Sequence, residues 1–195
     1  MANTWIASDH HLHHRNIIKF ERSRNQFGTF SDSGELLTAD LDAMNQAIID
    51  AHNSLVSPDD LTYFLGDVCW KPQKAAELLQ QMNGRKILLV GNHDKLIPSF
   101  VACFESVHDY LKIKHNGHKL VLMHYPLVDW NGMHHGSMHI HGHVHNGYNG
   151  LPGRIHDSAI GGNELRPYSL DDVITNLLQI PPRPHGILSS TNFAG

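Results

Sequence analysis

The sequence has few cysteines, no long apolar run and no excess of basic residues. Its 195 residues include two cysteines, Cys69 and Cys103, which excludes a disulfide framework and favours a reducing compartment. No stretch approaches the length of a membrane span, and the N-terminus has neither the basic nor the apolar segment of a secretory signal. We therefore expect a soluble cytoplasmic protein without a membrane partner.

The charge balance argues against a large nucleic-acid partner. Lys and Arg number 15 against 19 Asp and Glu, and the resulting net charge of −4 disfavours a large nucleic-acid surface held by phosphate neutralisation. A small nucleotide held through metal ions remains compatible with this charge. Histidine is abundant instead, with 18 copies, and it is the commonest metal ligand. The composition therefore points to metal binding.

The order of apolar runs predicts one α/β domain over residues 1–180. Strand-like runs cover residues 4–8, 61–65, 86–90, 107–114, 119–123 and 138–141, and further strands are expected between residues 154 and 160. Helices are expected at residues 16–20, at 41–55 after an N-cap at Thr38, at 72–82, and at 169–178 after a capping box at Ser169 and Asp172. Because strands and helices alternate up to residue 90, the strands of this part should be parallel.

Other segments contain turn residues in place of a regular apolar pattern. Asn116-Gly117 is a hairpin signal, and residues 22–34 are polar and typical of a loop. Residues 125–139 are rich in aromatic, Gly and His residues and are typical of a long functional loop. Residues 181–195 contain three prolines at their start, so we expect an extended or mobile tail.

Polar clusters follow the strand-like runs. They are Asp9 and His11, then Asp67, then Asn92, His93 and Asp94, then His124, and finally His143 and His145. Because the ends of neighbouring strands meet at one edge of a sheet, these side chains are expected in one cleft. Carboxylate, amide and imidazole ligands without thiolates suit Mn, Fe, Zn, Co or Ni. Seven such ligands can fill two sites if one carboxylate bridges ions about 3.5–4 Å apart, the arrangement used to cleave phosphate esters.

The same residues form five ordered blocks over residues 9–145. The blocks are Asp9-x-His11, Gly66-Asp67, Gly91-Asn92-His93-Asp94, His124 and Gly142-His143-x-His145. Together they resemble the calcineurin-like metallophosphoesterase superfamily. The resemblance implies two mixed β-sheets packed as a sandwich between helices, with metals at the strand ends.

The resemblance also implies a role for each residue. The ligands of the first metal would be Asp9, His11, Asp67 and His145, and those of the second Asp67, Asn92, His124 and His143, with Asp67 bridging. His93 would protonate the leaving oxygen or stabilise the transition state, with Asp94 orienting its ring. The nucleophile would be a hydroxide on two divalent ions, with Mn the best suited to activity and no covalent enzyme intermediate.

Two departures narrow the resemblance to one branch of the superfamily. Members that act on phosphoproteins carry an Arg soon after the Gly-Asp block and a Glu at the end of the Asn-His block. Here Val68-Cys69-Trp70-Lys71 follows the former, and Asp94 ends the latter. The run from Ser8 to Ile18 also resembles small phosphodiesterases, including short bacterial and phage-encoded members. The expected substrate is a small phosphodiester such as a cyclic or linear nucleotide, in a bacterial cell or a phage-infected host.

Several histidines near the blocks have two interpretations. His14 and Asn16 either contact the substrate phosphate or form the polar start of a helix. His10 and His13 are expected to point away or pack locally, and His52 to lie on the surface of its helix.

The aromatic and histidine residues of the later loops are open in the same way. Residues that either stack on a base or pack as core or lid are Trp70, Tyr125, Trp130 and Met133. His139 and His141 either hydrogen-bond around the ligands or fill a polar rim, and the rim is favoured for His134 and His135.

Two other functions remain open. A phosphomonoesterase is the nearest alternative, and a histidine-rich metal-binding protein without turnover belongs to a different class. Asn92 and His93 discriminate against the second, because a storage protein gains little from an amide ligand beside a proton donor.

Overall fold

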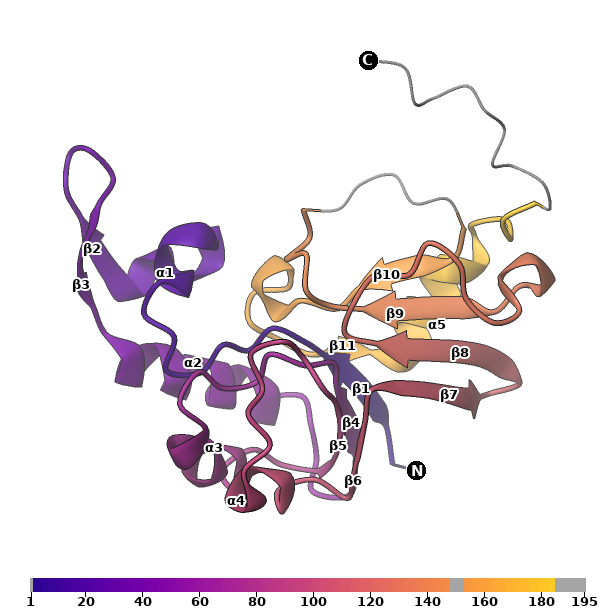
Figure 1. The fold of residues 1–195 in the computed structure, drawn as a ribbon, viewed down its shortest axis with the longest axis horizontal. Helices are drawn as coiled ribbons and strands as arrows, with labels where there is room; N and C mark the ends of the chain where they lie inside the picture. The colour runs from indigo at the N-terminus through magenta and orange to yellow at the C-terminus, as the bar shows by residue number, and fades with distance from the viewer. Residues whose placement is uncertain (1, 148–152, 185–195) are drawn as a thin grey trace.

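Two mixed β-sheets packed against each other form the centre of the protein (Figure 1). The computed structural model describes residues 2–147 and 153–184. The first sheet has the order β11-β1-β4-β5-β6, with strands Tyr168–Ser169, Thr4–Ala7, Leu61–Phe64, Arg85–Leu89 and Ser106–His108. The second has the order β10-β9-β8-β7, with strands Ile155–Asp157, Met138–His141, His118–Met123 and Tyr110–His115. The predicted α/β class with two mixed sheets is confirmed.

Strand direction follows the connections. In the first sheet β1, β4, β5 and β6 are parallel, as the alternation of strands and helices predicted, and β11 pairs antiparallel with β1. In the second sheet β8, β9 and β10 are parallel, while β7 and β8 form the antiparallel hairpin predicted from Asn116-Gly117.

The central strands of the first sheet are buried on both faces. Ala7, Phe64 and Leu88 pack under the helices α2 (Leu41–Asn53), α3 (Pro72–Leu79) and α4 (Pro98–Val101). The residue adjacent to each of these, Ile6, Leu65 and Leu89, faces the other way, toward the second sheet and α5 (Leu170–Leu178). This intersheet core includes Ile6, Leu65, Leu89, Leu120, Leu122, Met138 and Ile140. Burial on both faces explains why these strands have continuous apolar sequences.

Segment 22–34 is more ordered than predicted. After α1 (Ile17–Phe20) it forms the 3₁₀ helix η1 (Arg22–Phe27) and the strand β2 (Gly28–Phe30), which pairs with β3 (Leu36–Ala39) in a hairpin projecting from the sheets (Figure 1). The prediction of a loop was wrong because this short hairpin has no clear apolar alternation. Thr38 lies in β3, and the N-cap of α2 is Asp40, whose carboxylate accepts a hydrogen bond from the Ala43 N–H at 2.9 Å.

Later segments agree better with the sequence. Ser169 caps α5 by accepting from the Asp172 N–H at 3.3 Å, and β10 lies in the region predicted to hold further strands. Two further 3₁₀ turns are η2 (Met133–His135) and η3 (Ile160–Gly162). Residues 181–184 have no regular structure, and the rest of the predicted tail, 185–195, lies outside the described residues. None of the described helices is long and apolar enough to span a membrane.

His52 was predicted on the surface and is instead buried, with 1% of its surface exposed. The ring lies on the inner face of α2, where Nε2 is 3.0 Å from the carbonyl oxygen of Asn83. Helical spacing identified the apolar stripe, but it did not show that the stripe is wide enough to include this imidazole. His10 packs locally in the same core, stacked on Phe64 with ring centroids 4.8 Å apart.

Buried neutral histidines predict that stability falls in acid. Burial lowers the pKa of His52 and His139 to about 4. The unfolded chain binds these protons near pH 6.5, so stability is present above about pH 6.5 and is lost as the pH falls toward 4. We expect the thermal midpoint of metal-free protein to fall between pH 7 and pH 5, and His52→Gln to reduce that fall, because Gln still donates to Asn83 without titrating. An equal fall in the variant and the parent would contradict this assignment.

Candidate metal centre

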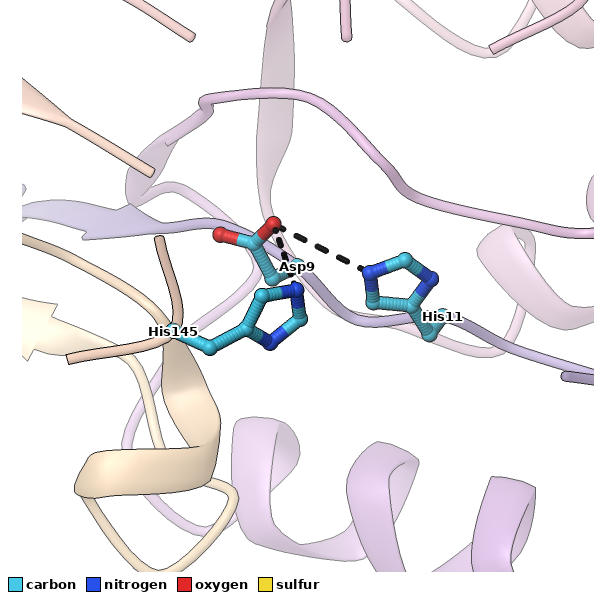
Figure 2. Close-up of side chains that lie close together, drawn as sticks. All are labelled: Asp9, His11 and His145. Carbon is cyan, nitrogen blue, oxygen red and sulfur yellow. Dashed lines mark ion pairs between the residues drawn. The ribbon is translucent and has the colours of Figure 1, made fainter. Parts of the chain in front are cut away.

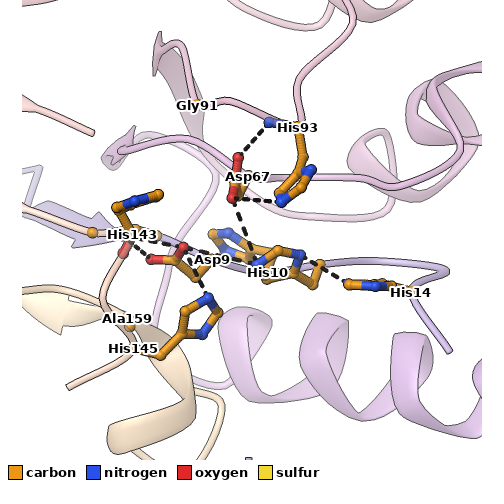
Figure 3. A network of polar contacts seen from close by, with 12 residues as sticks. Asp9, His10, His14, Asp67, Gly91, His93, His143, His145 and Ala159 are labelled. Carbon is orange, nitrogen blue, oxygen red and sulfur yellow. Dashed lines mark hydrogen bonds and ion pairs between the residues drawn. The ribbon is translucent and has the colours of Figure 1, made fainter. Parts of the chain in front are cut away.

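The predicted ligands come together where the carboxyl ends of the strands meet. Asp9 follows β1, Asp67 follows β4 and Asn92 follows β5, so the parallel strands of the first sheet present them at one edge. His124 directly follows β8, and the residues after β9 bring His143 alongside from the second sheet. Figure 3 shows side chains from both sheets converging on this point.

The first cluster consists of Asp9, His11 and His145, whose potential ligand atoms lie within 4.8 Å of one another. Asp9 Oδ1 is 3.8 Å from His11 Nε2 and 3.6 Å from His145 Nε2 (Figure 2). Asp9 is 0% and His11 3% exposed, and among the described residues His11 Nε2 has no hydrogen-bond partner. A buried nitrogen without a partner that faces carboxylates is well placed to ligate a cation.

The second cluster consists of Asp67, His124 and His143. Asp67 Oδ2 lies 3.6 Å from His124 Nε2 and 3.7 Å from His11 Nε2, so this single oxygen faces an imidazole of each cluster. Asn92 joins the second cluster, with Oδ1 3.0 Å from His124 Nε2. The arrangement contains all seven predicted ligands and places Asp67 between the two groups.

The two clusters fix their imidazoles differently. His124 Nδ1 lies 2.7 Å from the carbonyl oxygen of Leu65, so Nδ1 carries the proton and the lone pair of Nε2 points into the centre. His145 Nδ1 instead hydrogen-bonds to the carboxylate of Glu21. A carboxylate makes an imidazole a stronger ligand than a neutral carbonyl does. His145 should therefore be the stronger metal ligand of the two, because its partner is a carboxylate.

Glu21 and its partner Arg24 contact the candidate ligands, and the sequence did not reveal this role. Arg24 has 0% exposure, pairs with Glu21, and donates to the carbonyl oxygens of Asp9 at 2.9 Å and His10 at 2.8 Å. The available signal, opposite charges three residues apart, is weak in a segment predicted to be a loop. Through these contacts the pair holds the backbone of Asp9 and the ring of His145 in place.

We expect Glu21→Gln to weaken metal binding at the cluster of His145 by about 10–100-fold, the usual effect of removing such a partner. The other cluster should keep its affinity, because His124 is held by a backbone carbonyl. Titration calorimetry on metal-stripped protein measures both sites. Glu105→Gln is the control, since it removes a carboxylate from an exposed pair with Arg85. Equal losses at both sites, or no loss, would contradict the role given to Glu21.

The pKa values of the candidate ligands also favour a cation. Burial raises the pKa of Asp9 above its usual value, and the Asp67 carboxylate contributes in the same direction. Burial, and then the neighbouring His145, lower the pKa of His11. Burial also opposes the charged form of His145, yet its hydrogen bond to Glu21 and the nearby charge of Asp9 raise its pKa. A positive ion between these groups would stabilise both the carboxylates and the neutral rings.

Five of the seven candidate ligands lie on strained backbone. Asp9, His11, Asp67, His143 and His145 all have left-handed φ angles, between 48° and 73°. Each such residue costs on the order of 1–3 kcal/mol and persists when its surroundings hold it. Strain of this kind gathers at functional sites, which supports the assignment of these turns.

Close packing explains a glycine in one of the blocks. A Cβ on Gly142 would lie 2.5 Å from Asp9 Oδ2, and the neighbouring N–H of His143 donates to the same carboxylate at 3.0 Å. Any larger residue would push this turn away from Asp9.

Asp94 does not orient the ring of His93, and this part of the prediction was wrong. Its two carboxylate oxygens accept hydrogen bonds from the backbone N–H groups of Asp67, Val68 and Gly91, each at 2.9 Å. Asp94 therefore ties the turn after β4 to the turn after β5. The His93 N–H donates to Asp67 Oδ1 at 2.9 Å, and its ring, 40% exposed, places Nε2 3.9 Å from Asp67 Oδ2 (Figure 3).

The two predicted substrate-binding residues have different positions. His14 adjoins the centre, with Nδ1 3.2 Å from His11 Nδ1. Asn16 is exposed at the N-cap of α1, beside Lys19 in a surface groove, and the described contacts do not link it to the clusters. A role for either residue in substrate binding remains a prediction.

The open aromatic and histidine assignments are also resolved in part. Trp130 and Met133 pack with Val121 on the outer face of the second sheet, while Trp70 and Tyr125 remain 43% and 38% exposed. His139 and His141 are buried and hydrogen-bond to backbone groups of β8 and of nearby loops. His134 is half-buried and His135 is exposed, and both lie in η2.

Fold and site together define an α/β protein with two adjoining groups of candidate metal ligands. No protein-family model matches the chain. Over 148 residues it is 34% identical to the uncharacterized protein MJ1445 of Methanocaldococcus jannaschii, covering 74% of this chain and 70% of that one. The chain therefore belongs to the family of MJ1445.

Two more distant similarities agree with this assignment. The chain is 28% identical over 176 residues to the Gene 66 protein of Mycobacterium phage L5, covering 74% of this chain and 78% of that one. The crystal structure of AQ665 from Aquifex aeolicus, a protein of unknown function, superimposes with a TM-score of 0.68 at 25% identity, over 90% of this chain and all of that one. AQ665 therefore shares the fold.

Proposed function

We propose that this protein is a two-metal-dependent phosphoesterase of the calcineurin-like metallophosphoesterase superfamily and that it hydrolyses phosphodiesters. The observation that carries the proposal is the position of Asp67 Oδ2, within 3.7 Å of an imidazole nitrogen from each cluster. A carboxylate in this position can bridge two ions, and a bridged pair is the arrangement that phosphate ester cleavage uses. Mn²⁺ is the ion we propose for activity.

The chain's own residues then bind and orient the ester. A bound metal pair would withdraw charge from the phosphate oxygens and acidify a shared water. His93 reaches the centre through Nε2 while its ring stays open to solvent, which suits a group that gives a proton to the departing oxygen. In the overall reaction a water oxygen bonds to phosphorus, the P–O ester bond breaks, and the leaving oxygen takes the proton.

The cationic side chain described beside the candidate ligands is not available to a substrate, which favours a diester over a monoester. A monoester carries a second ionised oxygen, which a further cationic side chain would stabilise. Arg24 approaches the ligands, but it is fully buried and its described bonds go to Glu21 and to backbone carbonyls. A diester has a single negative charge and needs no such group.

A histidine-rich metal-binding protein without turnover is the alternative. Against it, His10, His52 and His139 are buried away from the two clusters' ligand atoms and pack or hydrogen-bond within the core. The high histidine content is therefore partly structural and does not indicate storage capacity.

The test is hydrolysis of bis-p-nitrophenyl phosphate and of p-nitrophenyl phosphate by metal-stripped protein, before and after addition of Mn²⁺ or another divalent ion. We expect activity that depends on added metal and that is higher on the diester. Preference for the monoester would favour the phosphomonoesterase. Binding of two ions without turnover of either ester, or of a panel of nucleotide diesters, would favour the non-catalytic alternative.

A further inference from the structure

Trp70 is a large aromatic side chain left 43% exposed directly beside the metal centre. It lies three residues after Asp67, and its ring centroid is 4.8 Å from that of His93. An exposed indole ring next to a proposed catalytic group offers a ligand a large aromatic face.

The indole is also held in a fixed orientation. Its ring is parallel to that of His14, with a 4.0 Å separation of the centroids and a 4° angle between the planes. His14 is in turn fixed to the ligand set, since its Nδ1 lies 3.2 Å from His11 Nδ1. The backbone N–H of Trp70 donates to the Leu12 carbonyl oxygen at 2.9 Å, which holds the Trp70 backbone near the start of the His14 turn. A plane held rigidly against the ligands is pre-organised to receive a second plane.

Other aromatic residues near the centre lack this geometry. Tyr125 meets the ligands His124 and His143 edge to face, at 5.0 and 4.7 Å. Trp130 is buried, with 5% exposure, and belongs to the packing of the second sheet. Among the described residues, Trp70 thus combines an exposed ring, a parallel backing ring and a position next to His93.

We propose that Trp70, backed by His14, is a stacking platform for the base of a nucleotide whose phosphate lies over the centre at Asp67. The inference rests on the proposed phosphoesterase function and specifies its substrate class, esters that carry a flat aromatic group near the scissile phosphate. Stacking of this kind accepts any base, because every base has a π face, so it selects for a nucleotide without selecting its sequence.

The test compares two ligands that share a sugar and a phosphate and differ in the base. Adenosine 5′-monophosphate and ribose 5-phosphate are titrated by calorimetry into Mn²⁺-loaded protein. We expect the nucleotide to bind about 5- to 150-fold more tightly, the usual contribution of one base stacked on an aromatic side chain. Trp70→Ala should reduce nucleotide affinity to that of ribose 5-phosphate and leave ribose 5-phosphate affinity unchanged. Trp70→Phe, which keeps an aromatic face, should retain most of the preference.

The outcomes separate this inference from the proposed function. Equal binding of the two ligands to the parent protein would overturn the platform, and metal-dependent diester hydrolysis would still support the phosphoesterase. Equal weakening of both ligands in Trp70→Ala would also overturn it, because the tryptophan would then shape the centre instead of contacting the base. If neither ligand binds and no ester is hydrolysed, the function fails and the platform fails with it.

Discussion

Asp67→Asn is expected to weaken metal binding at both clusters at once. The substitution keeps the shape of the side chain, and the Oδ1 position can still accept the His93 N–H, so the turn should remain folded. It removes the negative charge at Oδ2, which lies 3.6 Å from His124 Nε2 and 3.7 Å from His11 Nε2. The affinity loss should exceed the about 10–100-fold caused by losing an outer partner of a ligand. Elemental analysis of purified protein measures the result.

Asp9→Asn is the matched control for this experiment. Asp9 contacts His11 and His145 of the first cluster, so its variant should weaken that site and leave the second filled. Two ions retained in the Asp67 variant would show that this carboxylate is not shared. Loss confined to one site would assign Asp67 to a single metal.

His93→Ala is expected to slow hydrolysis of nucleotide diesters by about 10²–10⁴-fold, the usual contribution of a general acid. The loss should be smaller on nitrophenyl esters, whose leaving group departs without needing a proton. Both metals should stay bound, because His93 is outside the two ligand clusters and its ring is partly open to solvent. Steady-state rates on the two ester types, with metal analysis of the same samples, make the comparison.

The control for His93 is His115→Ala, which removes an imidazole on β7 that pairs with Asp171 of α5. This variant should leave the rates unchanged. Equal losses of His93→Ala on both esters would indicate stabilisation of transition-state charge. Loss of a metal ion in that variant would instead make His93 a ligand.

The strands and the convergence of the candidate ligands were predictable because their signals are local. An apolar run followed by Gly with Asp, Asn or His marks a buried strand and the turn that ends it, and the order of such runs implies which ends meet. Asp67 and Asn92 follow this rule directly, each after a glycine just beyond the end of a strand. The parallel register of β1, β4 and β5 then accounts for their convergence.

The errors arose where a residue's partner is distant in sequence. Asp94 was assigned to its neighbour His93, but its carboxylate meets backbone N–H groups 26 and 27 residues away as well as that of Gly91. Glu21 reaches His145 across 124 residues, so no spacing rule connects them. A sequence pattern can show that a polar residue lies in a turn beside the site. Its hydrogen-bond partner depends on tertiary packing, which the pattern does not contain.

The spread of ligands over both sheets links metal binding to the integrity of the whole fold. The two clusters draw on turns between residues 9 and 145, and neither sheet alone holds a complete cluster pair. Separation of the sheets, or fraying of β1, would therefore break up the clusters and release any ion that they hold. An ion that binds the folded chain alone stabilises it by about 4 kcal/mol when free metal is about 1,000 times Kd. A change in cellular metal supply would then alter the lifetime of this protein as well as its activity.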